Sequence, residues 1–298
     1  MLNGHKVIVV TPAGRRRFLP IIQHYIMRES IHGSGVIDEW RLWINTKDQA
    51  DIDLMEDMAT ANPDFIKCQY SEDGPLGNIG DMSAIRSFYT KETLDPDAVY
   101  LRIDDDIVFV DTDAFKTLAR FRLDNLHYFC ITANMVNSGL CSHLHDRMGM
   151  HPPMDRVLWS SEGGPLHWSV NMATLIHDTF IRDIHGGRVD AWKQYKRWEL
   201  WENPRFGIAC TAYLGKDLLA LLGKWEGDED ETFFTEIWPR RIKRINAICG
   251  KSLMAHYAYF PQRDNGMETQ QRPIKPGNDG LIPANILVRY KKLAGVNL

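Results

Sequence analysis

Three consecutive aspartates, Asp104, Asp105 and Asp106, are the residues whose type and spacing most strongly indicate chemistry. They follow the apolar run 99–103, and a second apolar run, 107–110, begins directly after them. Burying three unpaired carboxylates between two such runs would be prohibitively costly. The aspartates are therefore either solvated at an exposed strand end or ligands of a divalent cation. An oxygen-rich set suits Mg²⁺ or Mn²⁺, which carboxylates commonly hold together with the phosphate oxygens of a substrate.

A second acidic cluster and a histidine lie much further along the chain. Five acids occur within six residues, namely Glu226, Asp228, Glu229, Asp230 and Glu231. Acids are favoured in the first turn of a helix by its dipole, but five exceed what a helix start requires. His256 stands between Ala255 and Tyr257 in LMAHYAYFPQR, where a histidine without other context is more typical of a packed core than of a metal site.

Alternating strands and helices in the first part of the chain must position the acidic triplet. The apolar runs, periodicities and turn residues predict strands at 6–10, 39–45, 65–70 and 98–111, and helices at 17–31, 51–61 and 82–89. Such alternation favours βαβ units, a parallel sheet and ligand binding at the carboxyl ends of the strands.

The second half of the chain is less regular. The range 140–168 is rich in His, Met, Pro and Gly, which predicts loops that cover a site. A strand and a helix are expected within 206–223, and a helix within 231–241 that stops at Pro239. Without an internal repeat or linker, we expect one α/β domain over 1–298, with a C-terminal extension at 261–298.

The ordered constellation of triplet, acidic cluster and histidine resembles the nucleotide-sugar-dependent glycosyltransferases of the GT-A fold, the Asp-x-Asp type. The resemblance implies a Rossmann-like, mostly parallel sheet flanked by helices, with an irregular C-terminal half. It divides the domain into a nucleotide-sugar-binding half at 1–115 and an acceptor-binding and catalytic half at 116–260. It also implies that Asp106 binds Mn²⁺ or Mg²⁺, that Asp104 lies near the ribose or the metal, and that His256 is a further ligand. An imidazole ligand favours Mn²⁺.

The same resemblance implies the reaction. A sugar would pass from a nucleoside-diphosphate sugar, with a UDP-sugar favoured, to an acceptor hydroxyl. In inverting members an acidic residue of the second cluster is the general base, here Asp230 or Glu229, with Asp228 next. Retaining members also carry Asp-x-Asp but lack a base at this place, so the stereochemistry stays open.

A donor pocket is expected by analogy around the ends of the first strands. Its candidate residues are Thr11, Pro12, Ala13, Gly14 and Arg15 after the first strand, Asn45 and Thr46 after the second, Asn78 and Arg86 around the following helix, and Asp104 and Asp105. Arg15 and Arg86 could reach the phosphates of the donor, and Asn45 could contact its nucleotide base. Turn formation and surface charge are the alternative explanation for each of them.

Aromatic residues are candidates for the acceptor side. Sugar rings stack on aromatic planes, which suggests Trp168, Trp201 and Trp225, although core packing is the commoner role of tryptophan. The histidines between 143 and 185 show no HxxxH or HExxH spacing, which disfavours a zinc site. The basic run PRRIKR at 239–244 either complements a helix dipole or touches an anionic lipid or acceptor.

Composition limits the remaining possibilities. With 35 Lys+Arg against 39 Asp+Glu the net charge is −4, which disfavours a general nucleic-acid-coating role and a nucleic-acid acceptor. The acceptor is expected to be a glycan, a lipid-linked sugar or a protein. No apolar stretch is long enough to cross a bilayer, and the five cysteines show no CxxC spacing. We expect a cytoplasmic protein, with a peripheral membrane association left open.

Two other classes of function remain open at the level of sequence. A nucleotidyltransferase of sugar-nucleotide metabolism shares a nucleotide-binding sheet and metal carboxylates, and TPAGRRRFLP superficially resembles its phosphate loop, although only Gly14 stands where several glycines are usual. A non-catalytic carbohydrate-binding module of the same fold is the other.

Overall fold

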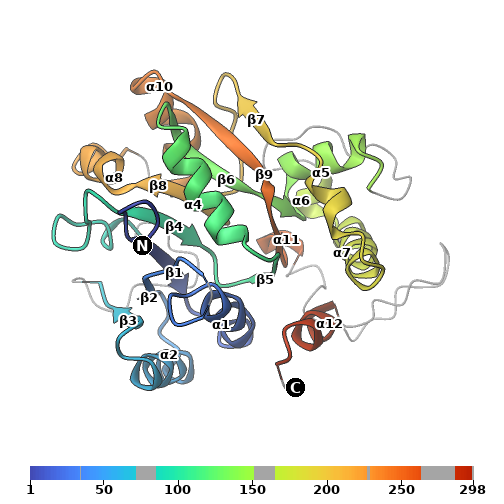
Figure 1. Ribbon diagram of the computed structural model, residues 1–298, viewed down its shortest axis with the longest axis horizontal. Coiled ribbons are helices and arrows are strands. Elements are labelled where there is room, and N and C mark those ends of the chain that lie inside the picture. The colour runs from blue at the N-terminus through green and yellow to red at the C-terminus, as the bar shows by residue number, and fades with distance from the viewer. Residues whose placement is uncertain (34, 72–84, 151–164, 227–228, 263–285, 297–298) are drawn as a thin grey trace.

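A mixed α/β sheet organises the molecule. The computed structural model describes residues 1–33, 35–71, 85–150, 165–226, 229–262 and 286–296. In this part of the chain nine strands form one sheet in the order β3-β2-β1-β4-β8-β6-β9-β5, with β7 also paired to β9 (Figure 1). The strands are β1 (Val7–Ala13), β2 (Glu39–Ile44), β3 (Ile66–Gln69), β4 (Val99–Ile103), β5 (Ile107–Val110), β6 (Tyr128–Val136), β7 (Arg197–Leu200), β8 (Cys210–Leu214) and β9 (Ile245–His256).

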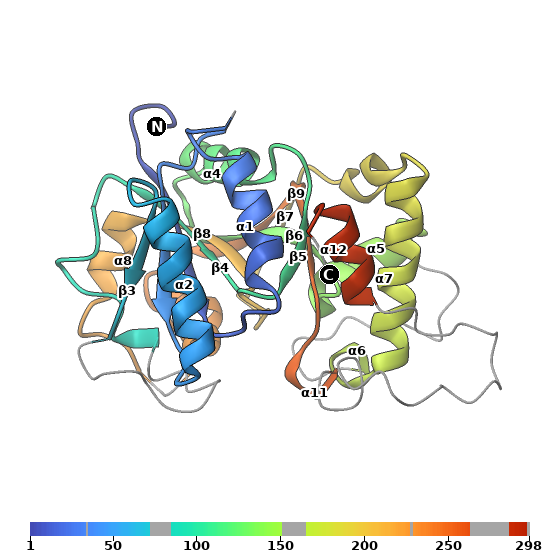
Figure 2. The same cartoon turned by 90° about the horizontal axis from the view of Figure 1, so that it is seen from below.

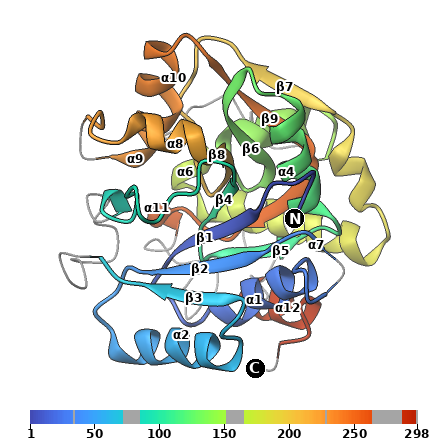
Figure 3. The same cartoon turned by 60° about the vertical axis from the view of Figure 1, so that its left-hand side comes forward.

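Parallel pairing defines the N-terminal side of this sheet. β3, β2, β1 and β4 are parallel neighbours, and β6 runs parallel to β9, whereas β8, β5 and β7 pair antiparallel with their neighbours. Figure 3 shows the first three strands side by side, with α2 along the outer one. The predicted α/β class is confirmed, and the strands expected at 6–10, 39–45 and 65–70 correspond to β1, β2 and β3.

Helices pack on the sheet and on one another. They are α1 (Leu19–Arg28), α2 (Gln49–Ala61), α4 (Ala114–Asp124), α5 (Gly139–Arg147), α6 (Pro165–Trp168), α7 (Val170–His185), α8 (Gly215–Leu221), α9 (Asp230–Thr232), α10 (Trp238–Arg241), α11 (Phe260–Gln262) and α12 (Ile286–Leu293), with a 3₁₀ turn at Val189–Lys193 and a π-helical turn at Phe233–Ile237. α4 packs against β4, β6, β8 and β9, while α12 packs against α7 and β5 (Figure 2).

The expected strand at 98–111 is wrong as a single element. It divides into β4, which lies between β1 and β8, and β5, which pairs antiparallel with β9 at the other edge of the sheet. The chain turns at the aspartates, where the amide of Ile107 donates to the carbonyl of Asp104 at 3.4 Å. The acidic triplet therefore occupies a turn between two buried strands.

Two further expectations differ from the structure. The range 140–168 was expected to be loops, but α5 occupies part of it, because Leu140, Cys141 and Leu144 share a buried face. The helix expected to stop at Pro239 continues to Arg241, since Pro239 lies in the first turn of α10, where a missing N–H costs little. The predicted helix at 82–89 lies partly outside the described residues.

Candidate active site

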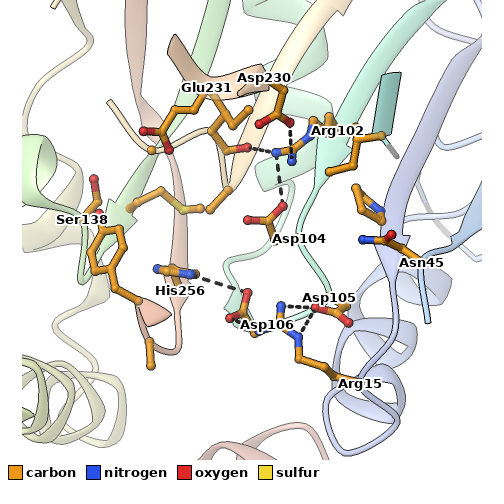
Figure 4. A pocket seen from close by; sticks show the side chains of 18 of the residues that line it. Arg15, Asn45, Arg102, Asp104, Asp105, Asp106, Ser138, Asp230, Glu231 and His256 are labelled. Atoms are coloured by element: carbon orange, nitrogen blue, oxygen red, sulfur yellow. Dashed lines mark hydrogen bonds and ion pairs between the residues drawn. The ribbon is translucent and has the colours of Figure 1, made fainter. Parts of the chain in front are cut away.

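A cavity of about 280 Å³ opens where the carboxyl ends of β1, β2 and β4 meet the ends of β6 and β9. Figure 4 shows Arg15 and Asn45 on one side of it, Ser138 and His256 on the other, and Asp230 and Glu231 between the two sides. The β4–β5 turn with the three aspartates also lines the cavity. Strand ends and the loops after them supply most of these groups, and α9 supplies Asp230 and Glu231. The ends of strands are the usual position of ligands in α/β sheets.

Asp104, Asp106 and His256 form a group that could hold a metal ion. One ligand atom from each lies within 4.8 Å of the others. The Nε2 atom of His256 is 3.5 Å from Oδ1 of Asp106. The two aspartates come from the β4–β5 turn and His256 from the end of β9, which pairs with β5 at Ile107, so strand pairing brings the histidine to the turn.

Charge balance within this group depends on Arg15. Its Nη1 donates to Asp106 at 2.9 Å and its Nε to Asp105 at 2.7 Å, and the amide of Gly14 donates to the other Asp105 oxygen at 3.0 Å. Asp105 is thus held by the loop after β1. Gly14 is required at this close approach, because a Cβ there would lie 2.8 Å from the carbonyl oxygen of Asn45.

Burial and ion pairing act in opposite directions on the metal-site candidates. Burial by itself raises the pKa of Asp106, but Arg15 and His256 outweigh it, so the pKa is lowered and the carboxylate is ionised. For His256 burial lowers the pKa, and the nearby Asp106 outweighs it, so the pKa is raised above its usual value. Because a metal requires the neutral imidazole, cation binding would release a proton from any protonated His256.

Arg102 connects the acidic triplet to the second acidic cluster. This buried arginine of β4 is 3.1 Å from Asp104 through Nη1 and 3.1 Å from Asp230 through Nη2, and it donates to the carbonyl of Ile208 at 2.7 Å. Sequence reasoning missed Arg102. The available signal was an arginine inside the otherwise apolar run 99–103, whose charge would require partners once buried.

Asp230 is the acid of the second cluster that is fully buried and lines the cavity. Burial raises the pKa of Asp230 to about 6, against the opposing effect of Arg102. Glu229, by contrast, pairs with Arg205 and keeps 43% of its side chain exposed. Glu231 lines the cavity and also pairs with Arg205, at 2.7 Å. Asp228 lies outside the described residues.

The expected donor residues divide into two groups. Pro12, Gly14, Arg15, Asn45, Asp104 and Asp105 line the cavity. Thr11, Ala13, Thr46 and Arg86 are not among its lining residues, and Asn78 lies outside the described part of the chain. Thr11 is buried and accepts a hydrogen bond from the indole of Trp40 at 2.9 Å. The guanidinium of Arg86 lies over the ring of Trp225, 5.3 Å from its centre.

The three candidate acceptor tryptophans have different environments. Trp168 is 59% exposed and adjoins His167, a cavity-lining residue whose ring is tilted against that of Tyr259, with 4.6 Å between the ring centres. Trp201 is 68% exposed and is not among the lining residues. Trp225 is stacked against Phe233, 5.0 Å between ring centres, within an aromatic cluster.

The remaining polar motifs take part in local contacts. Among the described residues, the acidic and histidine side chains close enough to share a metal ion are those of Asp104, Asp106 and His256, and the histidines at 143–185 form no such group. In the basic run, Arg240 donates to the carbonyl of Glu202, Arg241 pairs with Glu226, and Arg244 pairs with Asp217. In the described part of the chain no helix is both long and apolar enough to span a membrane.

Comparison with known proteins finds remote structural neighbours. The sequence matches no family model and no curated protein. Among solved structures, GalNAc-T7 with UDP, GalNAc and Mn²⁺ is 13% identical, with 86% of this chain and 44% of that chain covered and a TM-score of 0.48. A CMP:2-keto-3-deoxy-manno-octonic acid synthetase complexed with CTP is 11% identical, covering 84% and 90%, with a TM-score of 0.42. The 4-diphosphocytidyl-2C-methyl-D-erythritol synthase of Anaerococcus prevotii is 10% identical, covering 87% and 92%, at 0.40. Such low values assign no activity to this chain.

Proposed function

We propose that this chain is a metal-dependent glycosyltransferase that moves a sugar from a nucleoside-diphosphate sugar to an acceptor hydroxyl, with inversion at the anomeric carbon. One observation carries the proposal. Asp104, a member of the candidate metal group, and Asp230, a buried carboxylate with a raised pKa, contact the same guanidinium, that of Arg102, in one cavity. Sugar transfer requires a ligand set for the metal and a proton acceptor in the same cavity.

The residues fit a divalent cation. Two carboxylates and one imidazole within 4.8 Å are hard and borderline donors, a set that suits Mn²⁺ better than Mg²⁺. Bound there, the cation would offset the charge that develops on the leaving diphosphate. Arg15 holds Asp106 ionised and Asp105 in place, so the carboxylates are oriented before any substrate enters.

Asp230 is the proposed general base. Its Oδ2 accepts from Arg102, while its buried Oδ1 takes no hydrogen bond of normal geometry from the described residues. With a pKa of about 6 the carboxylate is ionised at neutral pH, yet basic enough to accept a proton. The acceptor oxygen would attack the anomeric carbon as the bond from that carbon to the nucleoside diphosphate breaks, and the hydroxyl proton would pass to Asp230. We place Glu229 and Asp228 behind it as candidates.

The two sides of the cavity suit different substrates. We assign the nucleotide to the side with Pro12, Gly14 and Asn45, at the ends of β1 and β2. We assign the acceptor to the side with His167 and Tyr259, where the exposed ring of Trp168 extends the wall toward solvent. A sugar ring offers C–H faces to such an aromatic plane.

Thermal unfolding with a panel of ligands tests the proposal. UDP-, GDP-, dTDP- and CMP-sugars are each added with Mn²⁺, Mg²⁺ or EDTA, and selective binding raises the melting temperature by mass action. The expected result is a rise that requires both Mn²⁺ and one class of nucleotide sugar and that disappears in Asp106→Ala. Product formation with that donor and a panel of glycan, lipid-linked and protein acceptors then tests transfer.

The same thermal assay, extended to nucleoside triphosphates and free glycans, separates the alternatives. A rise with a nucleoside triphosphate but with no nucleotide sugar would instead favour a nucleotidyltransferase. A rise with free glycans alone would favour a non-catalytic carbohydrate-binding module. Against a nucleotidyltransferase stands the position of Arg15, the arginine of the β1 loop among the cavity-lining residues, which is already bound to Asp105 and Asp106.

A further inference from the structure

The backbone of Tyr257 lies between the two sequence regions that supply the candidate metal ligands. Its amide donates to the carbonyl of Asp106 at 3.0 Å, and it directly follows His256 in the chain. The position of this single residue therefore affects both Asp106 and His256. Whatever fixes the Tyr257 carbonyl fixes the spacing between a carboxylate ligand and an imidazole ligand.

Two buried side chains hold that carbonyl. Nε2 of His177, on α7, lies 2.9 Å from the Tyr257 oxygen, and Nδ2 of Asn137 donates to the same oxygen at 3.0 Å. Asn137 also reaches the carbonyl of His256 at 3.3 Å. It adopts a φ of 60° in the bend between β6 and α5, a left-handed conformation that asparagine tolerates better than most residues.

The hydrogen-bond chain continues to the C-terminal helix. The hydroxyl of Tyr290, on α12, is 2.8 Å from Nδ1 of His177, and both residues are fully buried. Because the Tyr257 carbonyl can only accept, Nε2 must carry the proton, and Nδ1 of the neutral ring must accept from the Tyr290 hydroxyl. Burial also lowers the pKa of His177 to about 4, which keeps the ring neutral. By donating to Nδ1, Tyr290 thus stabilises the tautomer and ring orientation that hold Tyr257.

We propose that His177 and Tyr290 are positioning residues for the metal site, so that α12 controls cation affinity without contributing a ligand. The inference rests on the proposed function, because it takes Asp106 and His256 to be ligands. It also gives α12 a role in the metal site, although α12 lies far from Asp106 in the sequence. Loss of the hydroxyl would free the His177 ring and let His256 move relative to Asp106.

Mn²⁺ binding to the full chain, measured by isothermal titration calorimetry without any nucleotide, tests the inference. Tyr290→Phe is expected to weaken Mn²⁺ binding about tenfold, the effect typical of a residue that orients a metal ligand. Tyr100→Phe is the matched control, because Tyr100 is also buried and its hydroxyl is also hydrogen-bonded, in this case accepting from the amide of Asp95 at 2.8 Å. The control should lose stability but keep its Mn²⁺ affinity.

A pair of substitutions at His177 separates positioning from a general loss of α12 packing. His177→Leu removes both the donor to the Tyr257 carbonyl and the acceptor for Tyr290, whereas the side-chain amide of His177→Gln can still supply both. We expect near-normal Mn²⁺ affinity for His177→Gln and about tenfold weaker binding for His177→Leu. Melting temperatures in EDTA report whether each variant folds.

The outcomes distinguish failure of the inference from failure of the proposed function. If the unsubstituted chain binds Mn²⁺, Asp106→Ala does not, and Tyr290→Phe and His177→Leu bind normally, the inference is wrong and the metal site stands. If the unsubstituted chain binds no Mn²⁺, or Asp106→Ala binds it normally, both are overturned.

Discussion

The two sides of the cavity are built in different ways. On the N-terminal side, two loops at the ends of adjacent parallel strands supply the contacts: Gly14 and Arg15 after β1 contact Asp105 and Asp106 after β4. On the C-terminal side, the groups come from distant segments, as when Asn137 bonds to the carbonyl of Tyr257 and Tyr290 to His177. Parallel strands with short βα loops create the first arrangement, whereas the second depends on β9 crossing between β6 and β5.

Substitutions on the two sides of the cavity should act in different ways. The N-terminal side is a compact ion-pair network whose loss removes charge from the cavity directly. The C-terminal side is a set of oriented groups whose loss changes geometry first. Substitutions on the two sides should therefore differ in which measured quantity they affect, and the following predictions test that expectation.

Asp106→Ala should have the largest effect. It removes one candidate ligand and the partner of both Arg15 and His256, so metal-dependent donor binding should be lost and transfer should fall by on the order of 10³-fold or more. The measurement is the Mn²⁺-dependent change in melting temperature together with the transfer rate. Asp113→Ala, at an exposed aspartate, is the control and should behave normally. Normal donor binding by Asp106→Ala would contradict the assignment of Asp106 as a metal ligand.

Asp230→Asn should separate chemistry from binding. Without a proton acceptor, kcat should fall by about 10²- to 10⁴-fold, while donor binding should be unchanged. Glu229→Gln is the matched control from the same cluster, because Glu229 pairs with Arg205 and does not line the cavity. If Glu229→Gln abolished transfer and Asp230→Asn did not, the base would be Glu229. Unchanged transfer in both would favour a retaining mechanism.

The pH dependence of kcat should show an acid limb near pH 6. The base must be ionised, so activity should fall about tenfold per pH unit below the pKa of Asp230, which is about 6, and level off above it. Because the positive charge of Arg102 lowers that pKa, Arg102→Met should move the limb to higher pH. A limb that stayed in place in Arg102→Met would count against Asp230 as the titrating group.

Trp168→Ala should affect the acceptor alone. Loss of an exposed aromatic plane worth about 1 kcal/mol should raise KM for the acceptor by about fivefold and leave KM for the donor unchanged. Trp201→Ala is the matched control, since Trp201 is similarly exposed but, unlike Trp168, does not adjoin a cavity-lining residue. Equal effects of the two substitutions would remove the special role of the Trp168 side.

Gly14→Ala should have the smallest effect on the transfer rate and should act mainly on the free energy of unfolding. The added Cβ would meet the Asn45 carbonyl at 2.8 Å and force the β1 and β2 loops apart, costing about 1 to 3 kcal/mol. For a chain of this size the melting temperature should fall by several degrees, about 2 to 4 °C for each kcal/mol. The amide of Gly14 also holds Asp105, so donor affinity should fall as well. An unchanged melting temperature would show that the two loops separate at no cost.

Local patterns in the sequence were sufficient for the N-terminal elements. β1, β2, β3, α1 and α2 are encoded by short apolar runs and helical periodicity, which depend on neighbouring residues. The acidic triplet and the acidic cluster were also visible, because charges within or beside apolar runs require partners or solvent. The sequence near the cluster does not indicate which of its acids is buried, since the burial of Asp230 and the exposure of Glu229 follow from their tertiary contacts.

The sequence by itself thus determined an α/β protein with the acidic triplet after a buried strand. The tertiary structure alone decided that β4 and β5 lie apart in the sheet, that Arg102 joins Asp104 to Asp230, and that Tyr290 reaches His177. The physical reason is that propensity and periodicity act over a few residues. Burial, ion pairing and strand order instead depend on segments that meet only after the chain has folded.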